Sequence, residues 1–153
     1  MAWRVSDFAV IGLLAVLAAA TAWLQNTAPP PGLNEEDRAI RQTISRQMAA
    51  FRTGDDKAAF REAAPDIKAQ FVSEDAFMDM VRAHYRPIHR AQTYDFTGPS
   101  KPIAAHQEMR IQRVFITDET GSGHQARYIM QKQPDRSWKI AGCHLLGSPE
   151  LAI

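Results

Sequence analysis

His84 is the polar side chain whose position in the sequence best suits chemistry, because it falls within an otherwise apolar helical stripe. At 100° per residue, one helix face collects Phe77, Met80, Val81, His84, Tyr85 and Ile88. An imidazole titrates near neutral pH and can bind a ligand or move a proton, so His84 and Tyr85 could act as a pair. The alternative is a buried histidine that only hydrogen-bonds to a carbonyl or to another side chain.

Three aromatic residues further along the chain carry polar tips that suit the wall of a binding cavity. Tyr94, Tyr128 and Trp138 each combine an apolar ring with a hydrogen-bonding group, and such residues also serve as ordinary core. Asp95 alternates with its aromatic neighbours, so we expect it to point towards solvent, where it is a poor general base. The candidate ligand-binding residues are His84, Tyr85, Tyr128 and Trp138.

No motif for nucleophilic catalysis or metal binding accompanies these candidates. Cys143 and His144 are adjacent on a predicted strand, so they point to opposite faces and cannot easily share a metal. Cys143 is the only cysteine, and we expect a small buried hydrophobe there. His106-Gln107-Glu108 resembles the start of a deaminase zinc motif but lacks the Pro-Cys-x-x-Cys that completes it. The sequence predicts no catalytic residue, no metal site and no cofactor.

The elements that must position these residues divide into a helical half and a strand half. Residues suited to cap or start helices are Asn34, Asp55, Pro65 and Ser73. Gly54 is suited to end the first helix. Pro87 predicts that the helix begun at Ser73 ends near residue 86.

The second half has the composition of β-strands. We predict strands at 88–96, 109–117, 126–132 and 138–146, a loop at 98–102 and a hairpin tip at 118–124. The apolar parity changes between Ile111 and Val114, which predicts a bulge. Helices followed by an antiparallel meander indicate an α+β fold. We expect N-terminal helices packed on a curved, cone-shaped antiparallel sheet of about four strands, with a cavity inside the cone.

An apolar segment precedes this domain. Phe8 to Leu24 runs 17 residues without a charge, at the lower edge of what spans a bilayer as a helix. Arg4 precedes the segment and acidic residues follow it, which sends the rest of the chain outward. An uncleaved anchor and a signal peptide cleaved after Ala22 both remain open. They predict a bacterial inner-membrane protein with a periplasmic domain, or a periplasmic or secreted protein.

Three regions follow from this pattern. Residues 1–24 are the anchor or signal peptide, 25–33 a proline-rich linker with Pro29 to Pro31 as a stiff spacer, and 34–153 a single α+β domain. The net charge is +1, from 18 basic and 17 acidic residues, so nothing resembles the basic footprint of a nucleic-acid binder. A single cysteine also excludes an internal disulfide.

Short motifs along the domain carry a family resemblance. They are Ala50-Phe51, Asp55-Asp56, Ala59-Phe60, Ala64-Pro65-Asp66-Ile67, Phe71, Phe77, Met80-Val81, Tyr85-Arg86-Pro87-Ile88, Arg90 and Trp138-Lys139-Ile140-Ala141-Gly142-Cys143. On these, residues 37–145 resemble the bacterial domain-of-unknown-function family number 4864, within the nuclear-transport-factor-2-like, ketosteroid-isomerase-like (SnoaL-like) superfamily of α+β cones. The resemblance implies a pocket but brings no assigned activity. Superfamily enzymes use an acidic base and hydrogen-bond donors inside the cone, and no such set maps onto this chain.

Three functions are consistent with the sequence. The leading one is a non-catalytic, membrane-tethered or secreted domain that binds a small apolar ligand or a protein partner, with a homodimer through the open sheet face as one form. The second is an isomerase- or hydratase-like enzyme that uses His84 with Tyr85 or Tyr128. It requires His84 to be accessible from a pocket. The third is a purely structural envelope component.

Overall fold

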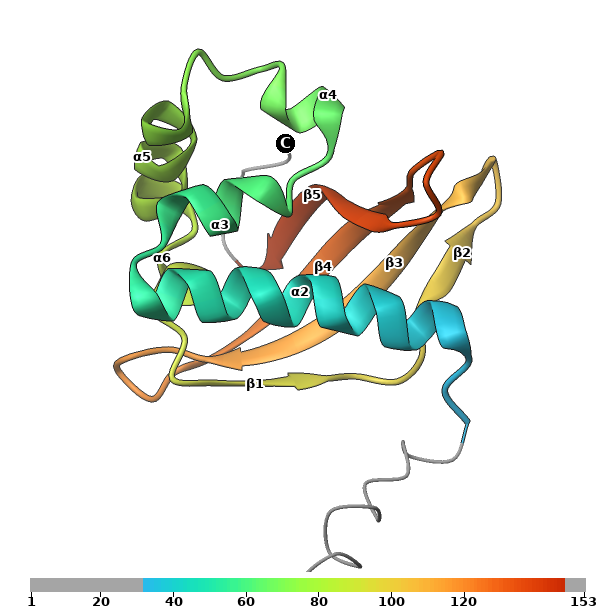
Figure 1. Cartoon of the computed structure of the whole chain (residues 1–153). Coiled ribbons are helices and arrows are strands. Elements are labelled where there is room, and N and C mark those ends of the chain that lie inside the picture. Colours follow the sequence, from blue (N-terminus) through green and yellow to red (C-terminus); the bar gives the residue numbers. More distant parts are fainter. Residues whose placement is uncertain (1–31, 148–153) are drawn as a thin grey trace, which may run out of the picture. The chain divides into compact units, whose positions relative to one another are not determined.

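Helices cover one face of an antiparallel sheet in the computed structural model, which describes residues 32–147 (Figure 1). The helices are α2 (Glu35–Thr53), α3 (Asp56–Arg61), α4 (Pro65–Lys68), α5 (Glu74–His84) and α6 (Arg86–His89). The strands are β1 (Thr93–Phe96), β2 (Lys101–Ile103), β3 (His106–Thr117), β4 (Gly123–Lys132) and β5 (Trp138–Leu146). The helices precede a curved sheet, so the predicted α+β class is confirmed.

The predicted apolar helix before the domain lies outside the described residues. Within 32–147, no helix has the length and apolarity that a bilayer crossing requires.

The predicted helix boundaries are confirmed by side-chain caps. The Asn34 side chain accepts a hydrogen bond from the backbone N–H of Asp37 at 2.8 Å. Gly54 ends α2 with φ = 70°, a left-handed conformation that favours glycine. Asp55 and Ser73 cap α3 and α5 in the same way as Asn34 caps α2. Local sequence therefore determines where these helices begin and end.

The sheet differs from the prediction in the position of its bulge. Strand order is β1-β3-β4-β5, with β2 also paired to β3, which makes five strands where about four were expected. The β3–β4 register runs without a shift from Met109 to Thr117, so the predicted bulge is wrong. Gln112 is fully buried and shares the core face with Val114, so the parity never changes and Ile111 lies on the other face. A register shift occurs instead between Ile129 and Met130, opposite β5.

The segment after α5 is helical where a strand was predicted. Strand β1 begins only at Thr93, and α6 occupies the first residues of the predicted strand 88–96. Pro87 is compatible with the first turn of a helix, where no backbone N–H is needed. Ile88 donates its N–H to the Tyr85 carbonyl at 2.9 Å and buries its side chain in the core. Ile88 is therefore buried in the core as part of a helical turn, and not as part of a strand. The short β2 likewise occupies part of the predicted loop 98–102.

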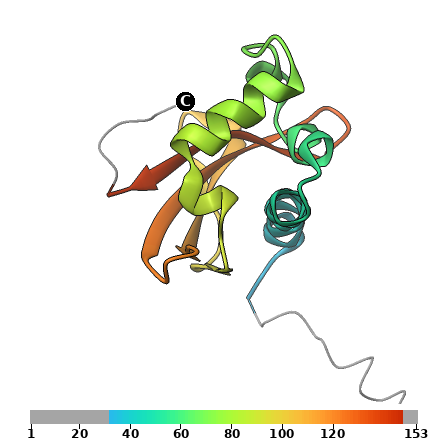
Figure 2. The same ribbon diagram turned by 90° about the vertical axis from the view of Figure 1, so that its left-hand side faces the viewer.

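Helix α2 crosses the sheet and supplies much of the core. Ile40, Ile44 and Met48 are buried along the face that packs against the sheet. The Thr43 hydroxyl donates to the Trp138 carbonyl at 3.1 Å, which ties the middle of α2 to the start of β5. Figure 2 shows α2 nearly end-on, beside one face of the sheet. The cone therefore has α2 as one wall.

A short backbone pairing joins the helical layer to the edge of the sheet. Ala64 donates its N–H to the Ile140 carbonyl at 2.7 Å, and Ile140 donates to the Glu62 carbonyl at 2.9 Å. Ala63 and Ala64 are buried at this junction, and Ala63 forms an isolated parallel bridge with Ile140. Small side chains allow the loop between α3 and α4 to approach β5 closely.

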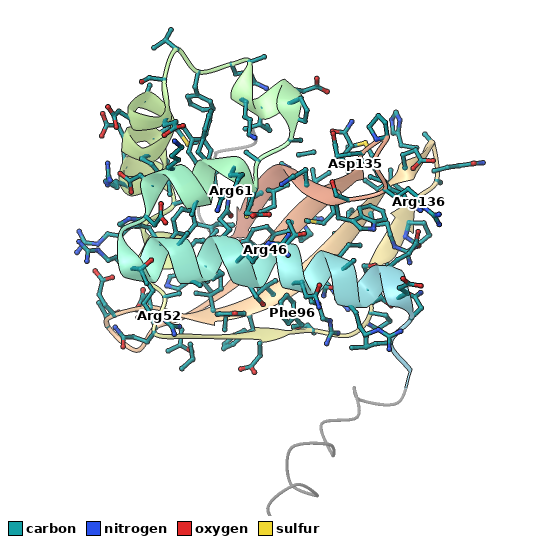
Figure 3. All side chains as sticks on the ribbon, viewed as in Figure 1. Arg46, Arg52, Arg61, Phe96, Asp135 and Arg136 are labelled. Carbon is teal, nitrogen blue, oxygen red and sulfur yellow. The ribbon has the colours of Figure 1, made fainter. Side chains whose placement is uncertain are left out.

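The Glu62 side chain strengthens this junction with ion pairs. Its carboxylate lies 3.0 Å from Arg46 of α2 and 3.5 Å from Lys139 of β5. Figure 3 shows Arg46 on α2 and Arg61 at the end of the neighbouring α3. Burial by itself raises the pKa of Glu62, but the Arg46 hydrogen bond and the charges of Arg46 and Lys139 hold the pKa below its ordinary value of 4.5.

We predict that Glu62 makes stability depend on pH in the acidic range. A depressed pKa in the folded state stabilises the fold above the ordinary pKa of 4.5, and this contribution is lost as pH falls through the folded pKa. Glu62→Gln should therefore be less stable than the wild type near neutral pH, and the difference should shrink below about pH 4. Urea unfolding across this range measures it, with the exposed Glu108→Gln as control. An equal difference at all pH values would contradict the prediction.

Candidate functional site

An apolar cavity lies between the helices and the inner face of strands β4 and β5. Its volume is about 50 Å³, and it opens to solvent. The described residues that line it are Gln47, Phe51, Ala63, Ile67, Phe77, Met80, Val81, Tyr85, Ile88, Tyr128, Ile140, Gly142 and Cys143. They come from α2, the α3–α4 junction, α4, α5, α6, β4 and β5, and so the cavity occupies the interior of the cone.

Few polar groups reach the cavity, and those described have protein partners. The Tyr85 hydroxyl donates to the Cys143 carbonyl at 3.1 Å. The Gln47 amide donates to the Ala59 carbonyl at 3.3 Å. The Tyr128 hydroxyl has only the Met48 sulfur at 3.6 Å, and a thioether is a weak acceptor. Tyr128 is therefore the lining residue whose hydroxyl has the weakest protein partner.

The cavity is electrically neutral. Burial raises the pKa of Tyr85 to about 12, and the nearby Cys143 contributes in the same direction. Burial also raises the pKa of Tyr128 and that of the Cys143 thiol well above their ordinary values. Among the described lining residues there is no Asp, Glu, His, Lys or Arg. Every ionisable group that the structure places there is therefore uncharged near neutral pH.

The structure brings together two of the four sequence candidates. Tyr85 and Tyr128 both line the cavity. Trp138 is buried in the core near α2 and is not among the lining residues. Its ring lies below the Lys132 ammonium, with 5.8 Å between the ammonium and the ring centroid. Trp138 therefore stabilises the start of β5.

His84 points away from the cavity. It is the last residue of α5 and is exposed. The cavity is lined on α5 by Phe77, Met80 and Val81, and His84 follows one turn later, at the end of the helix. The backbone also leaves helical geometry at Tyr85, with φ = −121° and ψ = 33°. The predicted apolar stripe thus includes Tyr85 but not the imidazole.

Gln47 and Cys143 line the cavity although neither was a sequence candidate. Gln47 lies one helical turn before Phe51 on the buried face of α2. This spacing is the one feature of the sequence that could have predicted that Gln47 faces the interior. Cys143 is half-buried and pairs with Tyr128 across the sheet, so both side chains share the inner face. Within residues 32–147, no three His, Cys, Asp or Glu side chains are grouped to hold a metal ion.

Comparison with known proteins identifies a family and nothing finer. A family model described as "Domain of unknown function (DUF4864)" matches residues 33–153. No curated protein matches the chain, and neither does any solved structure.

We predict that the Cys143 thiol reacts slowly with iodoacetamide in the folded protein. Its raised pKa leaves little of the reactive thiolate near pH 8, and each unit of pKa costs about tenfold in thiolate. Alkylation should be at least about tenfold slower in the folded chain than in the chain unfolded by denaturant. An exposed thiol introduced by Ser122→Cys in a Cys143→Ser background is the control. Equal alkylation rates for the folded wild type and the folded control would show that the Cys143 thiol is accessible and that its pKa is not raised.

Proposed function

Because the chain belongs to the domain of unknown function (DUF4864) family, we propose its role from the cavity: a non-catalytic domain that binds the apolar part of a small ligand or of a protein partner. The observation that carries this proposal is the apolar, neutral cavity inside the cone. Ligand sites in proteins are concave and mostly apolar, with a few convergent polar groups. The lining residues here that carry a hydroxyl or an amide are Gln47, Tyr85 and Tyr128.

The size of the cavity restricts what enters it. At about 50 Å³, it is far smaller than the roughly 300–1,000 Å³ of drug-sized ligand sites. It has room for a small apolar group, such as the end of an alkyl chain or one aliphatic side chain. The remainder of the occupant lies at the open mouth. We therefore propose that only part of the ligand enters the cavity.

The electrostatics support binding over the alternative isomerase- or hydratase-like activity. That activity requires a proton acceptor in the cavity, and the histidine considered for the role is exposed on α5. The phenols of Tyr85 and Tyr128 have raised pKa values, so they donate hydrogen bonds but do not accept a proton near neutral pH. The binding proposal is supported by the lining, which is mostly apolar, carries no charged side chain and therefore suits a neutral molecule.

We also infer that the domain is one of the nuclear-transport-factor-2-like cones. Two observations support this assignment: helices that precede a curved antiparallel sheet, and a final strand that begins Trp138-Lys139-Ile140. Cones of this kind have a cavity between helices and sheet, which is where this chain has its cavity. The assignment concerns the fold, and chemistry does not follow from it.

We propose that the domain works on the periplasmic side of a bacterial inner membrane, tethered or released there. The uncharged segment Phe8 to Leu24 and its charged flanks support this location. The mass of the mature protein tests the tether. An intact chain in the membrane fraction is expected for an anchor, and a chain that begins at Trp23 in the soluble fraction for a signal peptide. An intact chain confined to the cytosol would contradict both.

Filling the cavity tests the binding proposal. We predict that Val81→Phe abolishes binding of 1-butanol, a small neutral probe, because the larger ring occupies the cavity. Methyl NMR shifts of Ile67 and Ile140 report binding to the full chain in nanodiscs. Val72→Phe, on a side chain that is 98% exposed, should bind the probe as the wild type does.

The stability of the same variants tests whether the space exists. Overpacking a filled core costs about 1–3 kcal/mol, so Val114→Phe, which is buried away from the cavity, should lose that much. Val81→Phe should lose less, because the cavity accepts the ring. Equal losses, or probe binding that survives Val81→Phe, would contradict the proposal.

A further inference from the structure

A row of basic side chains crosses the face of the sheet opposite to the helices. Arg113 of β3 lies directly opposite Arg127 of β4, which lies opposite His144 of β5. Arg113 and Arg127 are exposed, and His144 is half-buried. Their neighbours on the same strands point to the core, as the burial alternation shows. Figure 2 shows the helices gathered on the other side of these strands.

The basic row forms no ion pair within the described part of the chain. Neither arginine, nor His144, forms an ion pair with any residue in 32–147. By contrast, four other arginines each have a carboxylate partner: Arg46, Arg82, Arg86 and Arg110. Like charges directly opposite each other on a sheet destabilise it. An external anion on the row would offset this repulsion.

Apolar side chains border the row on both sides. On one side lie Phe115 and Leu146, which are 41% and 38% exposed. On the other side Ile111 pairs with Ile129, and both are half-buried. A polar centre with apolar borders fits a folded segment that is acidic along one line and apolar beside it. A free inorganic anion would use only the centre.

We propose that this face binds an acidic amphipathic helix of a protein partner, which lies across the strands with its carboxylates on Arg113, Arg127 and His144. Neighbouring strands are about 4.8 Å apart, so the row spans about 10 Å. Residues i, i+4 and i+7 of a helix span about 10.5 Å. Alternate residues of an extended strand cover about 13–14 Å over the same three positions and fit less well.

The same face suits a second copy or a lipid surface less well. A twofold, face-to-face pair would set the basic row against its own copy, which repels. An anionic membrane presents phosphates everywhere, including opposite the exposed Asp95, which pairs with Phe115 at the border of the patch. A helix can confine its acidic residues to the row. This surface is separate from the cavity, so the two proposals stand or fall independently.

Binding of a designed helix to the full chain in a nonionic detergent tests the proposal. The probe is a synthetic amphipathic helix with glutamates at i, i+4 and i+7 and leucines beside them, and its glutamine analogue is the control. The double variant Arg113→Gln/Arg127→Gln should weaken Kd about fivefold to tenfold, since each exposed charge pair changes affinity a few-fold. Added salt should weaken wild-type binding. Arg38→Gln/Arg52→Gln removes two exposed charges from α2 and should bind as the wild type does.

Four results would overturn the proposal. The first is equal binding of the glutamate and glutamine helices, and the second is an equal loss of affinity in both double variants. The third is tighter binding of monomeric short-chain phosphatidylglycerol than of the helix, which would make lipid phosphate the ligand. The fourth is a homodimer in sedimentation that dissociates in Arg113→Gln/Arg127→Gln, which would make a second copy the occupant. Cavity binding of 1-butanol is unaffected in each case.

Discussion

Two backbone hydrogen bonds to Ile140 connect the helical layer to the edge of β5, and the cavity depends on them. They run between Ile140 and the Glu62–Ala64 segment, where two buried alanines permit close approach. The segment thereby becomes one side of the cavity, with α4 and α5 continuing beyond it. Glu62 adds ion pairs from α2 and β5 at the same point. If this junction opened, the apolar lining of α4 and α5 would lose its opposite wall.

Charge is distributed around the cavity and kept out of it. The ionic groups of Glu62 and its partners lie at the junction, whereas the lining contributes phenols, an amide and a thiol. In an apolar environment a lone charge is costly, so raised pKa values keep these groups neutral. The domain consequently has two regions of different character. One is the small neutral cavity, and the other is the outer sheet face, which the Arg113–Arg127 pair crosses.

Local signals in the sequence predict most of the fold but only part of the site. Asn34, Asp55 and Ser73 act within three residues of themselves, and so the helix starts could be predicted. The alternation in β4 likewise identifies Tyr128 as inward-facing. The predictions fail where tertiary packing decides. Gln112 is polar yet buried, which conceals the regular parity of β3, and His84 is exposed at the end of α5, beyond the residues of that helix that line the cavity. No local pattern in the sequence indicates the burial of Gln112 or the exposure of His84.

The central claim is that the cone encloses an accessible, apolar and neutral cavity, and a crystal structure of the full chain under xenon pressure tests it most directly. Xenon enters apolar cavities and reports them by its electron density. We predict one xenon site bounded by Val81, Tyr128 and Ile140, with the surrounding side chains unmoved. An interior without xenon, in which those side chains have closed the space or ordered waters fill it, would contradict the account.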